Sequence, residues 1–249
     1  MAGHSKWKQI KRKKAVADQR RGQLFTKLIR EITIAARQGG GDPNGNPRLR
    51  TAIDTARAAS MPADNIERAI KKGSGQLEGV NYVEVTYEGY GPGGAAIYIE
   101  ATTDNPNRTV AEIRHVFTRY GGNLGSANAV AWMFDKKGQV VVDAGKADED
   151  VTMEAALDAG AEDMVREGDE FVITTPVARL HAVTDALRAR KVEVKGAEIA
   201  VIPKSTVKVE GKDAGQLLRL MEALEELDDV ARVSSNFDID ADQMAEASA

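Results

Sequence analysis

VEVTYEGYGPGGAAIYIEA, residues 83–101, is the stretch at which the chain changes from helical to sheet-forming sequence. Val83–Tyr87 and Ala95–Ala101 have the composition and length of strands. The segment between them, Glu88–Gly94, consists largely of glycine and proline, which favour turns. The sequence therefore predicts a β-hairpin with a wide loop.

The glycines of this turn, Gly89-x-Gly91-x-x-Gly94, formally match the fingerprint of dinucleotide-binding proteins. In that fingerprint a helix follows the glycines, because the helix N-terminus binds the phosphates. Here a strand follows, so we expect a hairpin turn and no cofactor. The loop that begins at Gly39 is not a phosphate-binding loop either, because no Gly-Lys-Ser/Thr follows it.

The sequence before the hairpin predicts a helical bundle over residues 1–79. Apolar residues at helical spacing mark three faces: Leu24, Phe25, Leu28, Ile29 and Ile32; then Leu49, Ala52, Ile53 and Ala56; then Ile66 and Ile70. A loop rich in Gly, Asn and Pro over residues 39–47 separates the first two helices. We expect Ser60 to cap the third helix, Pro62 to lie in its first turn and Gly73 to end it.

The sequence after the hairpin alternates between helix and strand patterns. Asn107 is expected to cap a helix that ends at Gly121. Further helices are predicted over residues 151–165, 176–190 and 217–227, and strands over 130–134, 139–143, 171–175, 198–201, 206–209 and 230–237. We predict an α+β multidomain chain, in which the helical bundle is followed by two ferredoxin-like α/β domains, one inserted in the other. The predicted domains are 1–79, 80–133 together with 206–240, and the inserted 134–205, followed by a disordered tail over 241–249.

Charge is divided unevenly along the chain, although the net charge of the 249 residues is only −4. Residues 1–75 contain 17 Lys/Arg and six Asp/Glu, a net charge of +11, so the remaining residues carry −15. This asymmetry indicates a polyanionic partner for the N-terminal part. Residues 143–170 hold 11 Asp/Glu and two basic residues, which is typical of a solvated face. The alternatives are docking of a basic protein and shielding of the chain's own basic arm.

The positive charge is densest between Lys6 and Lys14, where six of nine residues are Lys or Arg and one is Trp7. This pattern favours contacts with nucleic-acid phosphates, with Trp7 either stacked on a base or packed in the bundle. A solvated terminus and a membrane surface are the alternatives, and the latter would need more large apolar residues. The candidate nucleic-acid-binding residues are Lys6, Trp7, Lys8, Lys11, Arg12, Lys13, Lys14, Arg20, Arg21, Lys27 and Arg30.

Other chemistry finds little support in the sequence. The chain has no cysteine, and its three histidines (His4, His115 and His181) lack the spacing of metal ligands, so we predict no catalytic, metal or cofactor site. Thr102–Arg108 is expected to be a helix cap and turn, or alternatively a site for a phosphate or a partner. Since no apolar run could span a membrane and no secretory signal is present, we expect a cytoplasmic protein. A mitochondrial presequence is disfavoured, because the basic segment continues into a well-patterned helix.

Several motifs resemble those of the YebC/PmpR family of probable transcriptional regulatory proteins. They are MAGHSKWKQIKRKK at residues 1–14, SMPADNIERAIKKG at 60–73, EGYGPGGA at 88–95, TDNPNRT at 103–109, GGNLG at 121–125 and AWMF at 131–134. The resemblance covers essentially residues 1–240. The chain departs from the pattern at Ala127-Asn-Ala129, where the family is expected to have Gly-Ser.

The resemblance implies a cytosolic bacterial protein with a helical domain and two α/β domains. It implies a DNA-binding transcriptional regulator, or a translational activator that binds ribosomal RNA, as relatives in mitochondria are described. In either case the basic N-terminal domain would contact phosphates, which do not by themselves distinguish DNA from RNA. The sequence leaves the target and the oligomeric state open.

Overall fold

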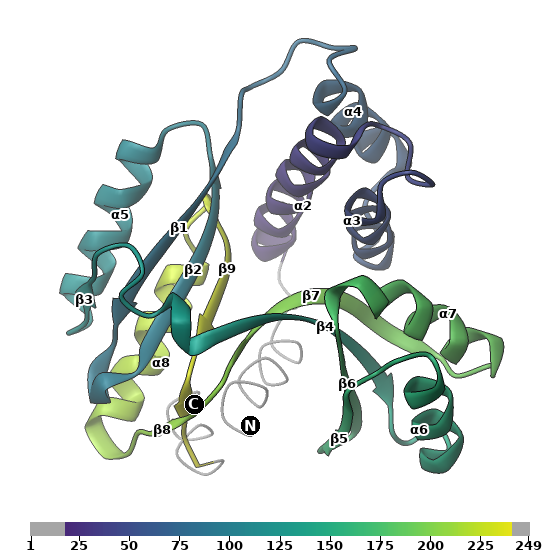
Figure 1. The fold of residues 1–249 in the computed structure, drawn as a ribbon. Coiled ribbons are helices and arrows are strands. Elements are labelled where there is room, and N and C mark those ends of the chain that lie inside the picture. Colours follow the sequence, from purple (N-terminus) through teal and green to yellow (C-terminus); the bar gives the residue numbers. More distant parts are fainter. Residues whose placement is uncertain (1–17, 241–249) are drawn as a thin grey trace. The chain divides into compact units, whose positions relative to one another are not determined.

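The computed structural model describes residues 18–240, and side chains from Gly22 onward. The chain divides into two compact units (Figure 1): unit 1 comprises residues 1–134 and 203–249, and unit 2 comprises Asp135–Ile202. Each unit is described by itself. The three-domain division stays a prediction, and the proposed disordered tail lies outside the described residues.

Three helices form the N-terminal part of unit 1: α2 (Asp18–Gly39), α3 (Pro47–Ala58) and α4 (Ala63–Gly73). Their shared core contains Leu28, Ile32, Leu49, Ala56 and Ile66, which confirms the predicted apolar faces. Leu24 is the exception, because 46% of it is exposed.

The ends of these helices differ in part from the prediction. Asn46 caps α3, since its side chain accepts a hydrogen bond from the Leu49 N–H. Ser60 does not cap α4: Pro62 holds that position without a side-chain bond, and Ser60 adopts a φ of +61°. Gly73 ends α4 as predicted, and a β-carbon there would lie 2.3 Å from the Thr33 carbonyl oxygen, so only glycine allows α4 to approach α2 this closely.

The predicted hairpin is confirmed and forms the centre of an antiparallel sheet, but its loop is shorter than predicted, because β1 continues through Glu88 to Tyr90. Its strands pair from Val83 opposite Thr103 to Tyr90 opposite Ala96, around a turn at Pro92–Gly94. The sheet has the order β3-β1-β2-β9 and consists of β1 (Val83–Tyr90), β2 (Ala96–Thr103), β3 (Asn123–Leu124) and β9 (Val230–Ser235). Two short strands, β8 (Val207–Lys208) and β10 (Phe237–Asp238), pair in parallel beside it.

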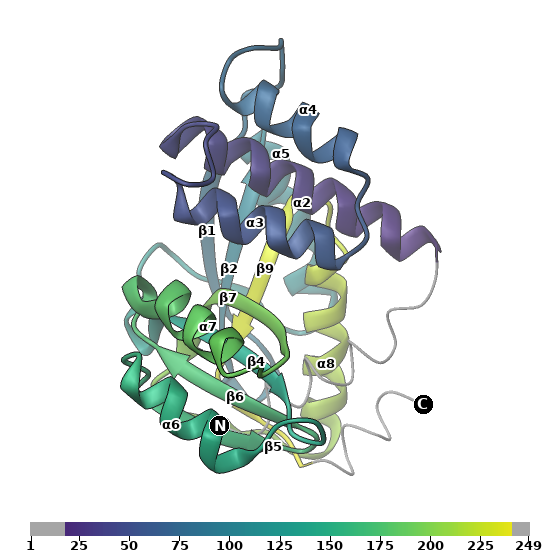
Figure 2. The same ribbon diagram turned by 90° about the vertical axis from the view of Figure 1, so that its right-hand side faces the viewer.

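Helices cover both faces of this sheet. On one face α5 (Pro106–Arg119) and α8 (Gly211–Glu225) bury a core that includes Ile97, Phe117, Leu217 and Val233. On the other face α2 contacts β2 and β9 (Figure 2). The N-cap of α5 is Asn105 and not the predicted Asn107, because the Asn105 side chain accepts the hydrogen bond of the Arg108 N–H.

Unit 2 follows the element order βαββαβ, with strands arranged β5-β6-β4-β7. Its core includes Val140, Phe171, Ile173 and Leu180. The elements are β4 (Phe134–Asp143), α6 (Glu149–Asp158), β5 (Asp163–Glu167), β6 (Glu170–Thr175), α7 (Leu180–Ala189) and β7 (Val194–Pro203). This order is that of a ferredoxin-like layer.

Two predictions are wrong in these regions. The helix expected over residues 151–165 ends at Asp158, because the chain turns at Gly160 (φ +96°) and Met164 then pairs with Ile173 in the sheet. Unit 1 does not have the ferredoxin-like order, since its first two strands, β1 and β2, form a hairpin with no α-helix between them. The described chain is thus a mixed α/β fold with seven α-helices and mainly antiparallel sheets.

Candidate nucleic-acid interface

The predicted nucleic-acid-binding residues fall into three groups in the structure. Lys6, Trp7, Lys8 and Lys11–Lys14 lie outside the described residues. Arg20 and Arg21 lie at the start of α2, where the helix is described and their side chains are not. Lys27 and Arg30 lie further along α2 and are described in full.

Arg30 is largely buried and is bonded within unit 1. Its guanidinium Nη1 lies 3.0 Å from Oδ1 of Asp229 and also donates to the Asp228 carbonyl. The guanidinium lies 5.5 Å from the ring centre of Tyr82, and only 14% of the side chain is exposed. On the same helix, Nζ of Lys27 donates to the Glu225 carbonyl at 2.5 Å. Through these bonds Lys27 holds α2 against α8, and Arg30 holds α2 against the residues directly before β9.

Asp229 is the centre of this network, and 3% of it is exposed. Its carboxylate also accepts hydrogen bonds from Arg108 (2.7 Å), Thr109 (2.7 Å) and Thr103 (3.0 Å). Burial by itself would raise the pKa of Asp229, but the hydrogen bonds that it accepts, led by that of Arg108, and the charge of Arg30 outweigh burial and lower the pKa. A buried carboxylate is thus balanced by two arginines and two hydroxyls.

The same network decides between the two interpretations of Thr102–Arg108. Arg108 binds Asp104 at 2.8 Å as well as Asp229, and both carboxylates raise its pKa. The start of α5 therefore already has two acidic side chains beside it, which disfavours a bound anion. The segment is a helix cap and turn.

Two further arginines of the bundle are used internally. Arg48 of α3 forms salt bridges with Glu31 (2.8 Å) and Glu84 (2.5 Å), and so joins α3 to α2 and β1. Arg37 donates to the carbonyls of Val80 and Tyr82, at 3.4 Å each. Much of the positive charge of the described bundle therefore stabilises unit 1.

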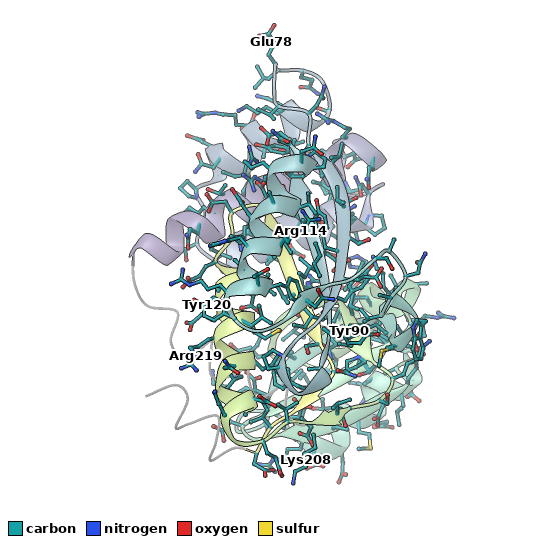
Figure 3. The ribbon with its side chains drawn as sticks, turned by 90° about the vertical axis from the view of Figure 1, so that its left-hand side faces the viewer. Glu78, Tyr90, Arg114, Tyr120, Lys208 and Arg219 are labelled. Carbon is teal, nitrogen blue, oxygen red and sulfur yellow. The ribbon has the colours of Figure 1, made fainter. Side chains whose placement is uncertain are left out.

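A smaller set of cations remains available to solvent. On α4, Arg68 and Lys72 are exposed and have no hydrogen-bond or ion-pair partner within the described part of the chain. Four more exposed cations of this kind lie on α5 and α8, among them two that Figure 3 labels; they are Arg114, Arg119, Lys212 and Arg219. The α/β part is therefore not uniformly acidic at its surface.

The acidic region of unit 2 is also partly neutralised. Lys195 lies 3.0 Å from Asp143 and 3.5 Å from Glu170, and its hydrogen bond lowers the pKa of Asp143. Glu162 pairs with Lys137 at 2.7 Å. These pairs support the interpretation of a solvated face.

Other ligand sites find no support within residues 18–240. No group of three or more acidic or histidine side chains is arranged to hold a metal ion there. Gly89 lies in β1, and Gly91 and Gly94 lie in the hairpin turn that β2 follows, so the helix that a dinucleotide site needs is missing from this position. Over the same residues, no helix is both long and apolar enough to cross a bilayer.

Comparison with known families assigns both parts of the chain. Residues 5–76 match the family model of the TACO1/YebC protein N-terminal domain, and residues 82–237 match that of the TACO1/YebC second and third domain. The chain belongs to the TACO1/YebC family. The predicted resemblance is therefore confirmed.

Relatives of known sequence cover nearly the whole chain. A protein of Gemmatimonas aurantiaca is 63% identical over 99% of this chain and 100% of its own, and one of Desulfatibacillum aliphaticivorans is 55% identical over the same shares. Both are named "Probable transcriptional regulatory protein". The crystal structure of a conserved hypothetical protein, Aq1575 of Aquifex aeolicus, is 48% identical and has a TM-score of 0.84, over 91% of this chain and 93% of that one.

Sequence reasoning missed three residues that the structure makes prominent: Asp229, Glu88 and Trp132. Asp229 and Glu88 are buried acids, at 3% and 5% exposure, whereas 67% of Trp132 is exposed. An acid beside a strand pattern gives no signal of a distant arginine. Trp132 lies in the AWMF motif, where the sequence predicted a strand over residues 130–134, and the structure has a 3₁₀ turn at Ala131–Met133.

Proposed function

We propose that this member of the TACO1/YebC family is a regulatory protein that binds DNA through its basic N-terminal segment, residues 1–17. The charge distribution carries the proposal: six Lys/Arg and no Asp/Glu lie within residues 1–17, whereas several arginines of the following bundle are paired internally. Dense like charge of this kind is stabilised by a polyanion. The names of the curated relatives support a role in transcription.

The structure narrows the proposed set of contacts. Phosphate contacts are assigned to Lys6, Lys8, Lys11, Arg12, Lys13, Lys14, Arg20 and Arg21, with Trp7 available to stack. Lys27 and Arg30 are left out, because each already binds a partner within unit 1. Binding would release counterions, so affinity would fall steeply with salt.

The test is to replace Lys11, Arg12, Lys13 and Lys14 with glutamine and measure affinity for a duplex across a salt series. The slope of log affinity against log salt should fall by about 3 to 4, because each phosphate that is no longer neutralised lowers it by roughly 0.9. The matched control replaces the four exposed cations of α5 and α8 (Arg114, Arg119, Lys212 and Arg219), which changes the net charge equally. An equal loss in both variants would show that only net charge matters and would contradict the proposed interface.

The natural target is identified by crosslinking the protein in cells and sequencing the bound nucleic acid. Discrete promoter fragments are expected. Recovery of ribosomal RNA without promoter enrichment would replace the DNA assignment with the ribosomal one, since the same basic segment can bind either backbone.

A further inference from the structure

Two exposed aromatic side chains lie side by side in unit 1, far along the chain from the basic segment. Nε1 of Trp132 and the hydroxyl of Tyr90 both donate to the carbonyl oxygen of Ala129, at 3.2 and 3.1 Å. Their exposed fractions are 67% and 39%. Tyr90 ends β1 and is labelled in Figure 3, and Trp132 lies in the 3₁₀ turn Ala131–Met133.

The loop that presents Trp132 is held in place by a buried carboxylate. Glu88 is 5% exposed and accepts hydrogen bonds from the backbone N–H groups of Asn128 (2.8 Å), Val130 (2.7 Å) and Ala131 (2.7 Å). Its own carbonyl accepts the Gly125 N–H at 2.8 Å. A buried acid needs such partners to be tolerated, and here they fix the backbone directly before Trp132.

An indole fixed in this way is pre-organised for a ligand. A tryptophan left in water forgoes the stabilisation that burial would give it, and a rigid ring loses little entropy when a partner stacks on it. The exposed neighbours in the loop, Ser126, Ala127 and Asn128, are small or polar. They do not form the contiguous apolar patch expected of a protein-docking surface.

A cation lies beside the backbone of Trp132. Nζ of Lys204 donates to the carbonyl oxygen of Trp132 at 2.9 Å, and the Lys204 side chain is exposed. The carboxylate of Glu88, which lies in β1 and holds this loop, is buried and bonded to three N–H groups. The surroundings of the two rings therefore suit a ligand with both flat bases and phosphates.

We infer that Trp132 and Tyr90 form a stacking platform for unpaired bases of a single-stranded nucleic acid, with Lys204 beside it for the backbone. The inference rests on the proposed function and extends it, because the basic segment accepts any phosphate backbone whereas a stacking platform requires bases that are not paired. A single strand would bind both the basic segment and the platform, whereas a duplex would bind the basic segment alone.

The two tryptophans of the chain allow a direct test. With Trp7→Phe, Trp132 is the single fluorescent indole, and titration with a twelve-nucleotide single strand, DNA or RNA, should quench it. A duplex of the same sequence should bind without quenching. Adding Trp132→Ala should weaken single-strand binding by roughly 5- to 150-fold, the range for one stacked base, and leave duplex binding unchanged.

Control variants separate the outcomes. Trp132→Phe keeps a ring and should retain most of the affinity, and Leu157→Ala, an exposed apolar change in unit 2, should have no effect. Unchanged single-strand affinity in Trp132→Ala, or no quenching at saturation, would overturn the platform and leave the proposed function intact. Failure of the proposed function is a different result, namely that the variant of Lys11–Lys14 binds every strand normally.

Discussion

Asp229 and Glu88 are both buried carboxylates of unit 1, yet they are satisfied by different groups. Asp229 is surrounded by side chains, two of them arginines, whereas Glu88 accepts hydrogen bonds from three backbone N–H groups. Asp229 binds Arg30, a cation that the sequence analysis assigned to nucleic acid. Glu88 shapes a loop and exposes an aromatic ring. The way a buried acid is satisfied thus determines which neighbouring residues remain available for ligands.

The largest expected effect comes from removing the Asp229 carboxylate. Asp229→Ala leaves the largely buried Arg30 without its anion, and breaking a buried pair in this way costs about 3–5 kcal/mol of unfolding free energy. Chemical denaturation measures the change. Asp228→Ala is the control, because Asp228 binds Arg30 through its backbone carbonyl, which the substitution retains. A loss below about 1 kcal/mol for Asp229→Ala would show that the network does not hold α2 to the sheet.

Glu88→Gln is expected to have the next largest effect, about 2 kcal/mol, because the three N–H groups lose a charged acceptor. In a Trp7→Phe background the emission of Trp132 should also change, since the loop before it loosens. Glu112→Gln, an exposed substitution on α5, should change stability by less than about 0.5 kcal/mol. If the emission of Trp132 stayed constant, the loop would owe its conformation to something other than Glu88.

The two carboxylates also show how far sequence reasoning reaches. The faces of α2 and α3 and the β1–β2 hairpin were predicted correctly, because their signals are local periodicity and turn residues. Arg30 and Asp229 are 199 residues apart in the chain, so no local spacing connects them. The charge of Arg30 was therefore assigned to a ligand when the fold uses it. Trp132 was placed in a strand, because its apolar neighbours gave no sign that Glu88 would fix a turn there.

The loss of unfolding free energy at acidic pH should distinguish the buried carboxylate of Asp229 from exposed acids. Its native pKa is lowered, so its contribution is complete above the unfolded pKa of about 3.9 and is lost as pH falls through the native value. Each unit of lowering corresponds to about 1.4 kcal/mol. Unfolding measured between pH 5 and pH 2 should show a shallower loss for Asp229→Asn than for the original chain. Parallel curves would show that other carboxylates dominate the loss at acidic pH.

The smallest effect on the unfolding free energy is expected for exposed cations that pair with no acid among the described residues. Replacing Arg68 and Lys72 with glutamine should change the unfolding free energy by less than about 0.5 kcal/mol, because neither has a hydrogen-bond or ion-pair partner among the described residues. Arg48→Gln is the informative contrast, since Arg48 binds Glu31 and Glu84 and its loss should cost about 1 kcal/mol. Duplex affinity should show the reverse order if α4 extends the basic interface: the salt slope would fall by up to about 2 for the α4 pair and stay constant for Arg48→Gln. A constant slope for both would confine the interface to the basic segment and the start of α2.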